Sequence, residues 1–194
     1  MERPAIVFDL DGTILERNFI QSLSLYLFPF GSTGKIFPGV IDVMKRIVVK
    51  ADIFALTARC KIARNKTKAW VNSYGLPFKE IIHSPFFLLT EPQRIRFKKK
   101  VLKDLKNKGI KIVIGVGDRA SDLDSYIQEG IFPVMISSFP QSSKYKKLIK
   151  RIQELGLKEK EDFMLFMQEN ENDLRFWDRA GEWIFEKLRD ITKT

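Results

Sequence analysis

Short apolar runs alternate with amphipathic stretches along the first 140 residues of this chain. Five runs are apolar or β-branched and end at turn residues, a pattern typical of buried strands: Ala5–Phe8, Ile53–Leu56, Lys79–Ile82, Lys111–Val116 and Phe132–Ile136. Four stretches between them carry apolar residues at helical spacing: Gly39–Val49, Ala63–Tyr74, Arg94–Lys108 and Ser121–Glu129. Strands that alternate with helices predict an α/β fold with a mainly parallel sheet of about five strands.

The pattern changes in residues 141–194, which show no strand signal and are predicted to form two or three helices with a break at Gly156. One side of the last helix is apolar and is expected to be buried: Leu174, Trp177, Ile184, Leu188 and Ile191. We therefore expect a core of residues 1–140 and a helical C-terminal extension, residues 141–194, packed on that core. A dimer or partner surface on these helices is the alternative.

Composition narrows the chemistry. The single cysteine, Cys60, excludes an internal disulfide and a multi-cysteine zinc site, and the single histidine, His83, excludes a histidine-rich metal site. Any metal is therefore expected to have oxygen ligands. The longest apolar stretch near the N-terminus, Phe19–Phe30, is too short to cross a bilayer, and the N-terminus does not resemble a signal peptide. These features predict a cytoplasmic protein without a transmembrane segment.

The net charge of +10 is unevenly distributed. Glu91–Lys111 holds nine basic residues against two acidic ones, and Lys61–Lys79 holds five basic residues and no acidic one. A concentrated basic face favours polyanionic partners such as nucleic acid or anionic lipid. A solvated helix face is the alternative interpretation.

Two carboxylates follow the first strand, at Asp9 and Asp11. Alternation along a strand would direct both to the same side, where like charges about 4 Å apart repel by roughly 4 kcal/mol at an effective dielectric of about 20. A cation or a shared proton must offset this repulsion. Thr57 and Asp118 also follow strands, and ligands of parallel α/β sheets bind at the carboxyl ends of the strands.

Four pieces occur in order: Asp9-Leu10-Asp11-Gly12-Thr13, Leu56-Thr57-Ala58-Arg59, a lysine on a helix, and Gly117-Asp118-Arg119-Ala120-Ser121-Asp122. This order resembles the haloacid dehalogenase-like (HAD) superfamily of phosphatases and phosphotransferases, over roughly residues 5–136. The resemblance implies a three-layer, Rossmann-like fold. It also implies an Mg²⁺-dependent phosphomonoesterase that acts through an aspartyl-phosphate.

The resemblance also assigns roles. Asp9 would be the nucleophile and Asp11 the general acid and base, with crowding by other carboxylates expected to raise the pKa of Asp11. Phosphate binding would fall to Thr57, Ala58, Arg59 and the helix lysine. Mg²⁺ would be held by Asp9, the Leu10 carbonyl, Asp118 and Asp122. For Arg59 a solvated position is an equal alternative, and for Asp122 the alternative is an acid that favours the first turn of a helix.

The helix lysine is one of three consecutive residues, Lys98, Lys99 and Lys100. The apolar stripe of this helix contains Lys98 near its centre and directs the other two toward solvent. A lysine in an inward stripe is unexpected unless its ammonium meets an anion. We therefore expect Lys98 to bridge Asp9 and the substrate phosphate, with Lys99 or Lys100 as alternatives.

The intervals Thr13–Thr57 and Arg59–Lys98 leave no room for a large cap domain, so the cap is expected to be minimal and the site open. An open site favours large substrates. The sequence around Phe97-Lys98 and Gly117–Tyr126 resembles lipin-type phosphatidate phosphatase domains, and the basic flanks suit a polynucleotide-end phosphatase. The expected substrate is thus a nucleic-acid end, a nucleotide or a phospholipid. A phosphatase of small metabolites and a non-catalytic phosphate-binding module are the alternatives.

Overall fold

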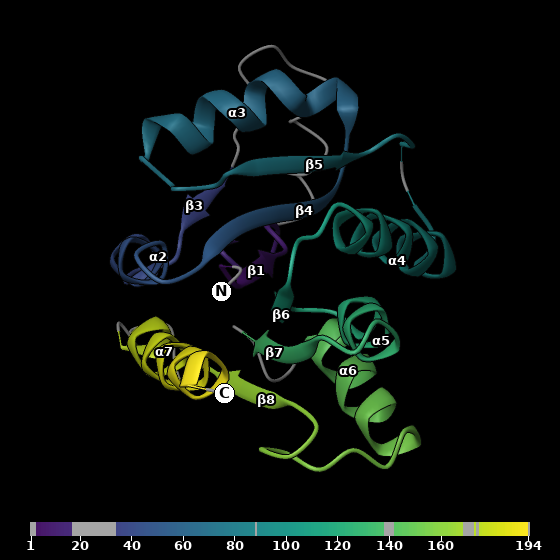
Figure 1. Cartoon of the computed structure of the whole chain (residues 1–194). Helices are drawn as coiled ribbons and strands as arrows, with labels where there is room; N and C mark the ends of the chain where they lie inside the picture. The colour runs from purple at the N-terminus through teal and green to yellow at the C-terminus, as the bar shows by residue number, and fades with distance from the viewer. Residues whose placement is uncertain are drawn as a thin grey trace.

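A six-stranded parallel sheet forms the centre of the molecule in the computed structural model (Figure 1). The structure describes residues 3–16, 34–87, 89–137, 142–168, 173 and 175–193. From one edge to the other, the strands are β5 (Glu80–Ser84), β4 (Asp52–Cys60), β1 (Ala5–Phe8), β6 (Ile112–Gly117), β7 (Phe132–Ser137) and β8 (Met164–Met167). The α/β class and the parallel sheet are confirmed.

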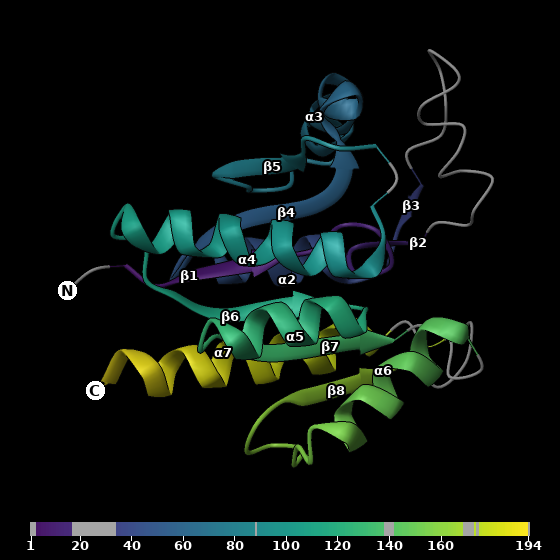
Figure 2. The same cartoon turned by 90° about the vertical axis from the view of Figure 1, so that its right-hand side faces the viewer.

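Helices cover both faces of this sheet (Figure 2). One face carries α4 (Glu91–Asn107) and α5 (Ala120–Gln128), with α6 (Ser143–Glu154) beside α5. The other face carries α2 (Val40–Ile47) and α7 (Phe176–Lys193), which contact each other. A 3₁₀ turn, η1 (Lys61–Ala63), leads into α3 (Arg64–Ser73), which lies near the edge strand β5. These three layers are those of the Rossmann-like fold predicted.

The central strand shows why the sheet is buried on both sides. Ala5 and Val7 pack with the apolar residues of α4 and α5, whereas Ile6 and Phe8 pack with those of α2 and α7. Continuous apolar strands are typical of parallel sheets because helices cover both faces. Phe8 also contacts the fully buried Trp177 of α7, with ring centroids 6.4 Å apart.

Only small elements interrupt the alternation of strands and helices within the described residues. β2 (Leu15–Glu16) pairs antiparallel with β3 (Lys35–Ile36). The described part of the interval between β4 and α4 contains η1, α3 and β5, consistent with a minimal cap. The stretch Phe19–Phe30 lies outside the described residues. No helix in the described ranges is long and apolar enough to cross a membrane.

The C-terminal segment corrects one prediction. It contains a strand as well as helices: β8 pairs in parallel with β7, in register from Val134 opposite Met164 to Ser137 opposite Met167. The strand is a four-residue apolar run, Met164–Met167, at the sheet edge and only partly buried. It contains no β-branched residue, and so short an apolar run does not distinguish a strand from a helix. The break at Gly156 is confirmed, since α6 ends at Glu154. The domain boundary at residue 140 stays a prediction.

The contact of α2 with α7 generates a test. A Cβ at Gly181 of α7 would lie 2.5 Å from Val43 Cγ2, closer than packed atoms allow. Helix propensity favours Gly181→Ala by about 1 kcal/mol, but overpacking costs about 1–3 kcal/mol and Val is stiff at χ1. We expect Gly181→Ala to lower the free energy of unfolding, measured by chemical denaturation. In a Val43→Ala background the sign should reverse; destabilisation of equal size in both backgrounds would contradict the contact.

Candidate functional site

Three carboxylates meet at the carboxyl ends of the neighbouring strands β1 and β6. Asp9 follows β1, Asp118 follows β6, and Asp122 lies in the first turn of α5. All three are buried, and each offers an oxygen within 4.8 Å of the others. The Asp9 N–H donates to the Val116 carbonyl at 2.8 Å, which joins the two strand ends. The sequence motifs therefore converge on one site.

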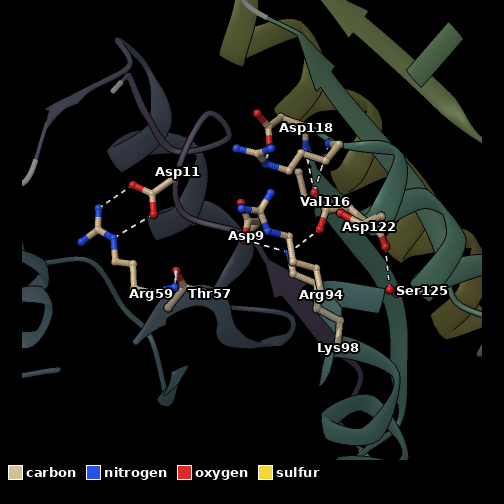
Figure 3. Close-up of polar contacts among 12 residues, drawn as sticks. Asp9, Asp11, Thr57, Arg59, Arg94, Lys98, Val116, Asp118, Asp122 and Ser125 are labelled. Carbon is tan, nitrogen blue, oxygen red and sulfur yellow. Dashed lines mark hydrogen bonds and ion pairs between the residues drawn. The ribbon is translucent and has the colours of Figure 1, made fainter. Parts of the chain in front are cut away.

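Lys98 reaches this site from α4, as Figure 3 shows. Its side chain is 2% exposed, and its ammonium donates to Asp9 Oδ1 at 2.9 Å and to Asp122 Oδ1. Burial alone would lower the pKa of Lys98, but the Asp122 and Asp9 carboxylates raise it well above its usual value. The ammonium is therefore charged at every physiological pH. Lys98, not the exposed Lys100 or the half-buried Lys99, occupies the inward position predicted from the helix stripe.

One charged lysine does not neutralise three carboxylates. Burial raises the pKa of Asp9 from 3.8 to about 7, and Asp122 and Asp118 add to this rise while Lys98 opposes it. Burial likewise raises the pKa of Asp118, against the lowering effect of Lys144 and Arg119. Clustered carboxylates that resist ionisation are the situation in which a hard divalent cation binds well.

The donor set fits such a cation. Asp118 Oδ1 is buried and has no hydrogen-bond partner among the described residues; Arg119 Nε lies 3.8 Å from it. Gly12 makes room for this carboxylate, since a Cβ there would lie 2.1 Å from Asp118 Oδ2 and the Gly12 φ of 91° already disfavours other residues. Carboxylate oxygens are the ligands that Mg²⁺ prefers.

Asp122 has a second role. Its Oδ2 accepts from the backbone N–H groups of Asp118 and Arg119 at 3.2 and 3.1 Å, while Lys98 contacts Oδ1. The helix-start interpretation of Asp122 is thus correct, and it coexists with membership of the carboxylate cluster.

Asp11 points away from this cluster and toward Arg59 (Figure 3). Arg59 Nη2 donates to Asp11 Oδ1 and Nε donates to Oδ2, both at 2.8 Å, a bidentate ion pair. β1 ends at Phe8, so the strand alternation that would place Asp9 and Asp11 together does not extend to Asp11. The solvated alternative for Arg59 is wrong, because the residue is 2% exposed and also donates to Thr67 Oγ1 at 3.2 Å.

The remaining predicted site residues lie in β4 and in the loop after β1. Thr57 is fully buried within β4, which extends to Cys60 rather than ending at Leu56, and its Oγ1 accepts from the Arg59 N–H at 3.2 Å. Ala58 lies where the pairing of β4 with β5 shifts register. The Leu10 carbonyl accepts from the N–H groups of Ile14 and Leu15, both at 3.1 Å, so the loop already uses this oxygen, and its place among the metal ligands stays a prediction.

Sequence reasoning missed four charged residues. Lys144 of α6 donates to Asp118 Oδ2 at 2.7 Å. Arg94 lies one helical turn before Lys98, and its buried Nε has no hydrogen-bond partner within the described part of the chain. Arg119 contacts Asp118, and Asp124 is buried against Arg151 at 2.9 Å. The spacing of Arg94 and Lys98, four residues apart on one helix face, was the one available signal.

Several solved structures share this fold. D,D-heptose 1,7-bisphosphate phosphatase from B. bronchiseptica is 16% identical, covers 95% of this chain and 99% of its own, and has a TM-score of 0.60. A haloacid dehalogenase-like hydrolase, SP0104 from Streptococcus pneumoniae, is 14% identical over 91% and 98%, with a TM-score of 0.54. A chain of the Pnkp1/Rnl/Hen1 RNA repair complex is 16% identical over 70% of this chain and 42% of its own, with a TM-score of 0.57. These likenesses confirm the HAD-like fold.

Sequence comparison is more specific. No curated protein matches the chain significantly. The family model described as "PITM 1-3, LNS2 domain" matches residues 6–138, which include Asp9, Lys98 and the Asp118–Asp122 motif. The match spans more than half of the chain, and the protein therefore belongs to this LNS2 domain family, on a HAD-like fold.

Proposed function

We propose that the protein is an Mg²⁺-dependent phosphomonoesterase that acts through a phosphorylated Asp9, on a large or polyanionic substrate. One observation carries the proposal: a buried Asp9 lies between a charged lysine and two further buried carboxylates, at the carboxyl ends of parallel strands. A core ion cluster of this kind is costly to bury unless it has a function. The phosphatases that share the fold support the same chemistry.

Asp9 would attack the phosphorus atom. Lys98 holds Asp9 Oδ1, so Oδ2 is the oxygen that would form the bond to phosphorus. A carboxylate is a weak nucleophile, so the reaction depends on fixed geometry and on neutralised phosphate oxygens. The Lys98 bridge fixes the geometry, because it holds Asp9 against α4 and α5. Its charge also neutralises part of the charge on the phosphate oxygens.

Asp9 and Asp118 would hold Mg²⁺, with Asp122 beside them. The cation would neutralise phosphate oxygens and allow the carboxylates to ionise together. Asp122 positions the site whether or not it binds the metal directly, because it fixes the backbone of Asp118.

Asp11 would act as general acid and base once Arg59 releases it. In the structure both Asp11 oxygens accept from Arg59, which stabilises the anion rather than the proton-bearing form. A bound phosphate dianion is a strong acceptor for the same guanidinium. Substrate that draws Arg59 away would remove this stabilisation of the anion, and Asp11 could then carry the proton that it gives to the ester oxygen as the bond from that oxygen to phosphorus breaks.

The second candidate function is a non-catalytic phosphate-binding module. The ion pair of Asp11 with Arg59 favours it, since an arginine-bound carboxylate is a poor proton donor. Such a module would keep the phosphate contacts and the metal but would not turn substrate over. Activity separates the two functions directly.

The main test uses Asp9→Asn, with Asp42→Asn as the control because Asp42 is exposed on α2. We expect hydrolysis of an aryl phosphate to require Mg²⁺, to stop with EDTA, and to fall by about 10³-fold or more in Asp9→Asn but not in Asp42→Asn. Activity that survives Asp9→Asn would refute the nucleophile. No activity on any substrate, together with retained phosphate binding, would favour the binding module.

The same assay defines the substrate class. Phosphatidate vesicles, 3′- and 5′-phosphorylated oligonucleotides and small sugar phosphates would be compared at equal phosphate concentration. The minimal cap and the basic residues of α3 and α4 favour the vesicles or the oligonucleotides. Turnover of the sugar phosphates alone would contradict the open-site argument.

Arg94 is expected to bind substrate phosphate, because its buried Nε lies on the same face of α4 as Lys98. Arg94→Ala should raise KM about tenfold or more with little change in kcat, since a charge-assisted hydrogen bond contributes about 1.5–3 kcal/mol. Arg96→Ala, exposed on the same helix, is the matched control. An equal rise in KM for the two substitutions would show that Arg94 acts only through its charge and does not contact the phosphate.

Burial makes metal-free stability depend on pH. The pKa of Asp9 is 3.8 before folding and about 7 after it, so the folded state retains a proton that the unfolded chain loses. This contribution to stability is complete below pH 3.8 and disappears as the pH rises through about 7. In EDTA, chemical denaturation should show the parent losing stability over this range relative to Asp9→Asn, which does not titrate. Parallel stability curves would show that Asp9 ionises normally.

A further inference from the structure

A cavity of about 220 Å³ lies between α3 and the edge strand β5, apart from the carboxylate cluster. One wall is a face of α3 and the loop after it, and the other is the strand. Ile81 and His83 are two residues apart on β5 and therefore share a strand face that lines the cavity, and Lys79 and Glu80 line it at the start of the strand. Figure 1 shows α3 and β5 running side by side at the end of the sheet farthest from β8.

The cavity is cationic. Arg64 and Lys68 lie one turn apart on α3 and both line it, and neither forms an ion pair with any described residue. Lys79 lines it as well and pairs with Asp52 at 2.5 Å on the surface. One lining residue, Glu80, is acidic, so the walls keep an excess of positive charge. An anionic group is the natural counterpart of this rim.

The interior is apolar and small. Val71, Leu76 and Phe78 line it together with Ile81. Cavities for drug-sized ligands measure about 300–1,000 Å³, so a volume of about 220 Å³ suits a molecule with one ring or a short chain. A ligand that fits both parts has a charged end and a compact apolar body.

His83 adds a polar contact inside. The residue is 6% exposed, and its buried Nε2 has no hydrogen-bond partner among the described residues. Burial lowers the pKa of His83, and the nearby Arg59 and Arg64 lower it further, so the imidazole is neutral at pH 7. Nδ1 lies 3.3 Å from the Ile81 carbonyl, which places the proton on Nδ1 and leaves Nε2 as an acceptor. Buried acceptors without a partner are rare, and a ligand hydroxyl would satisfy this one.

We propose that this cavity is a second binding site, for a small anionic ligand whose phosphate, sulfonate or carboxylate group meets Arg64 and Lys68 and whose apolar body carries a hydroxyl toward His83. This site does not depend on the proposed phosphatase activity, because it shares no residue with the carboxylate cluster. α3 links this cavity to the proposed active site, because Thr67 of α3 accepts a hydrogen bond from Arg59.

The test uses the single histidine of the chain as a reporter. The full-length protein would be titrated with 4-hydroxybenzenesulfonate, which has the anion, the ring and the hydroxyl and cannot be hydrolysed as a phosphate ester. NMR would follow the His83 imidazole resonances, which need no assignment by mutation. We expect a saturable shift, and weaker binding of benzenesulfonate, which lacks the hydroxyl.

Two variants distinguish a site from general charge attraction. Arg64→Gln with Lys68→Gln should weaken binding at least tenfold, whereas Lys61→Gln, exposed on η1 just before α3 and absent from the cavity wall, should not. The amide spectrum of each variant reports that the fold is intact. A shift that does not saturate, or equal weakening by Lys61→Gln, would overturn the proposal. Inorganic phosphate is titrated in the same way. Saturable binding of phosphate at this site would show that the anion alone is recognised. Binding of the arylsulfonate but not of phosphate would show that the apolar body is needed.

Discussion

The buried bridge of Lys98 to Asp9 and Asp122 is the interaction on which the rest of this molecule depends. One ammonium holds the end of β1 to the start of α5, and α4 carries it, so three elements far apart in the sequence are fixed by a single side chain. A buried charge is tolerated only where partners offset the loss of hydration. Lys98 has its partners, but the three carboxylates together exceed the charge it offers. The cluster therefore draws in further cations, from Lys144 and Arg119 in the structure and from a divalent metal in the proposed enzyme.

The accuracy of sequence reasoning here follows from how local each signal is. Lys98 was identified because a lysine within the apolar stripe of a helix is unfavourable without an anionic partner, and in the structure buried carboxylates are that partner. The central strands were identified because burial on both faces makes them continuously apolar. β8 was missed although it is also apolar, because four residues without a β-branched side chain fit a helix as well as a strand, and only the pairing with β7 decides between them.

Arg59 shows a different limit. Its position at the end of the second motif marked it as a phosphate contact or a solvated residue, and neither interpretation includes Asp11. The pair forms because β1 ends at Phe8, which frees the following loop to turn Asp11 toward β4. The position at which β1 ends therefore decides that Asp9 joins the carboxylate cluster and that Asp11 pairs with Arg59. The end of β1 at Phe8 was predicted correctly, and the error lay in extending the strand alternation past that end to Asp11.

The C-terminal segment is part of the site rather than an accessory to it. Lys144 lies in α6, beyond the predicted core, yet its ammonium is 2.7 Å from Asp118 Oδ2. The partly buried pair of Arg151 with Asp124 holds α6 in place, and Asp124 is two residues after Asp122 in α5. The same short helix thus fixes the carboxylate cluster on one side and anchors α6 on another. Because the cation at Asp118 arrives through this packing, the charge balance of the site depends on α6 as well as on the motifs that define the fold, and a core ending at residue 140 would lack one of its charges.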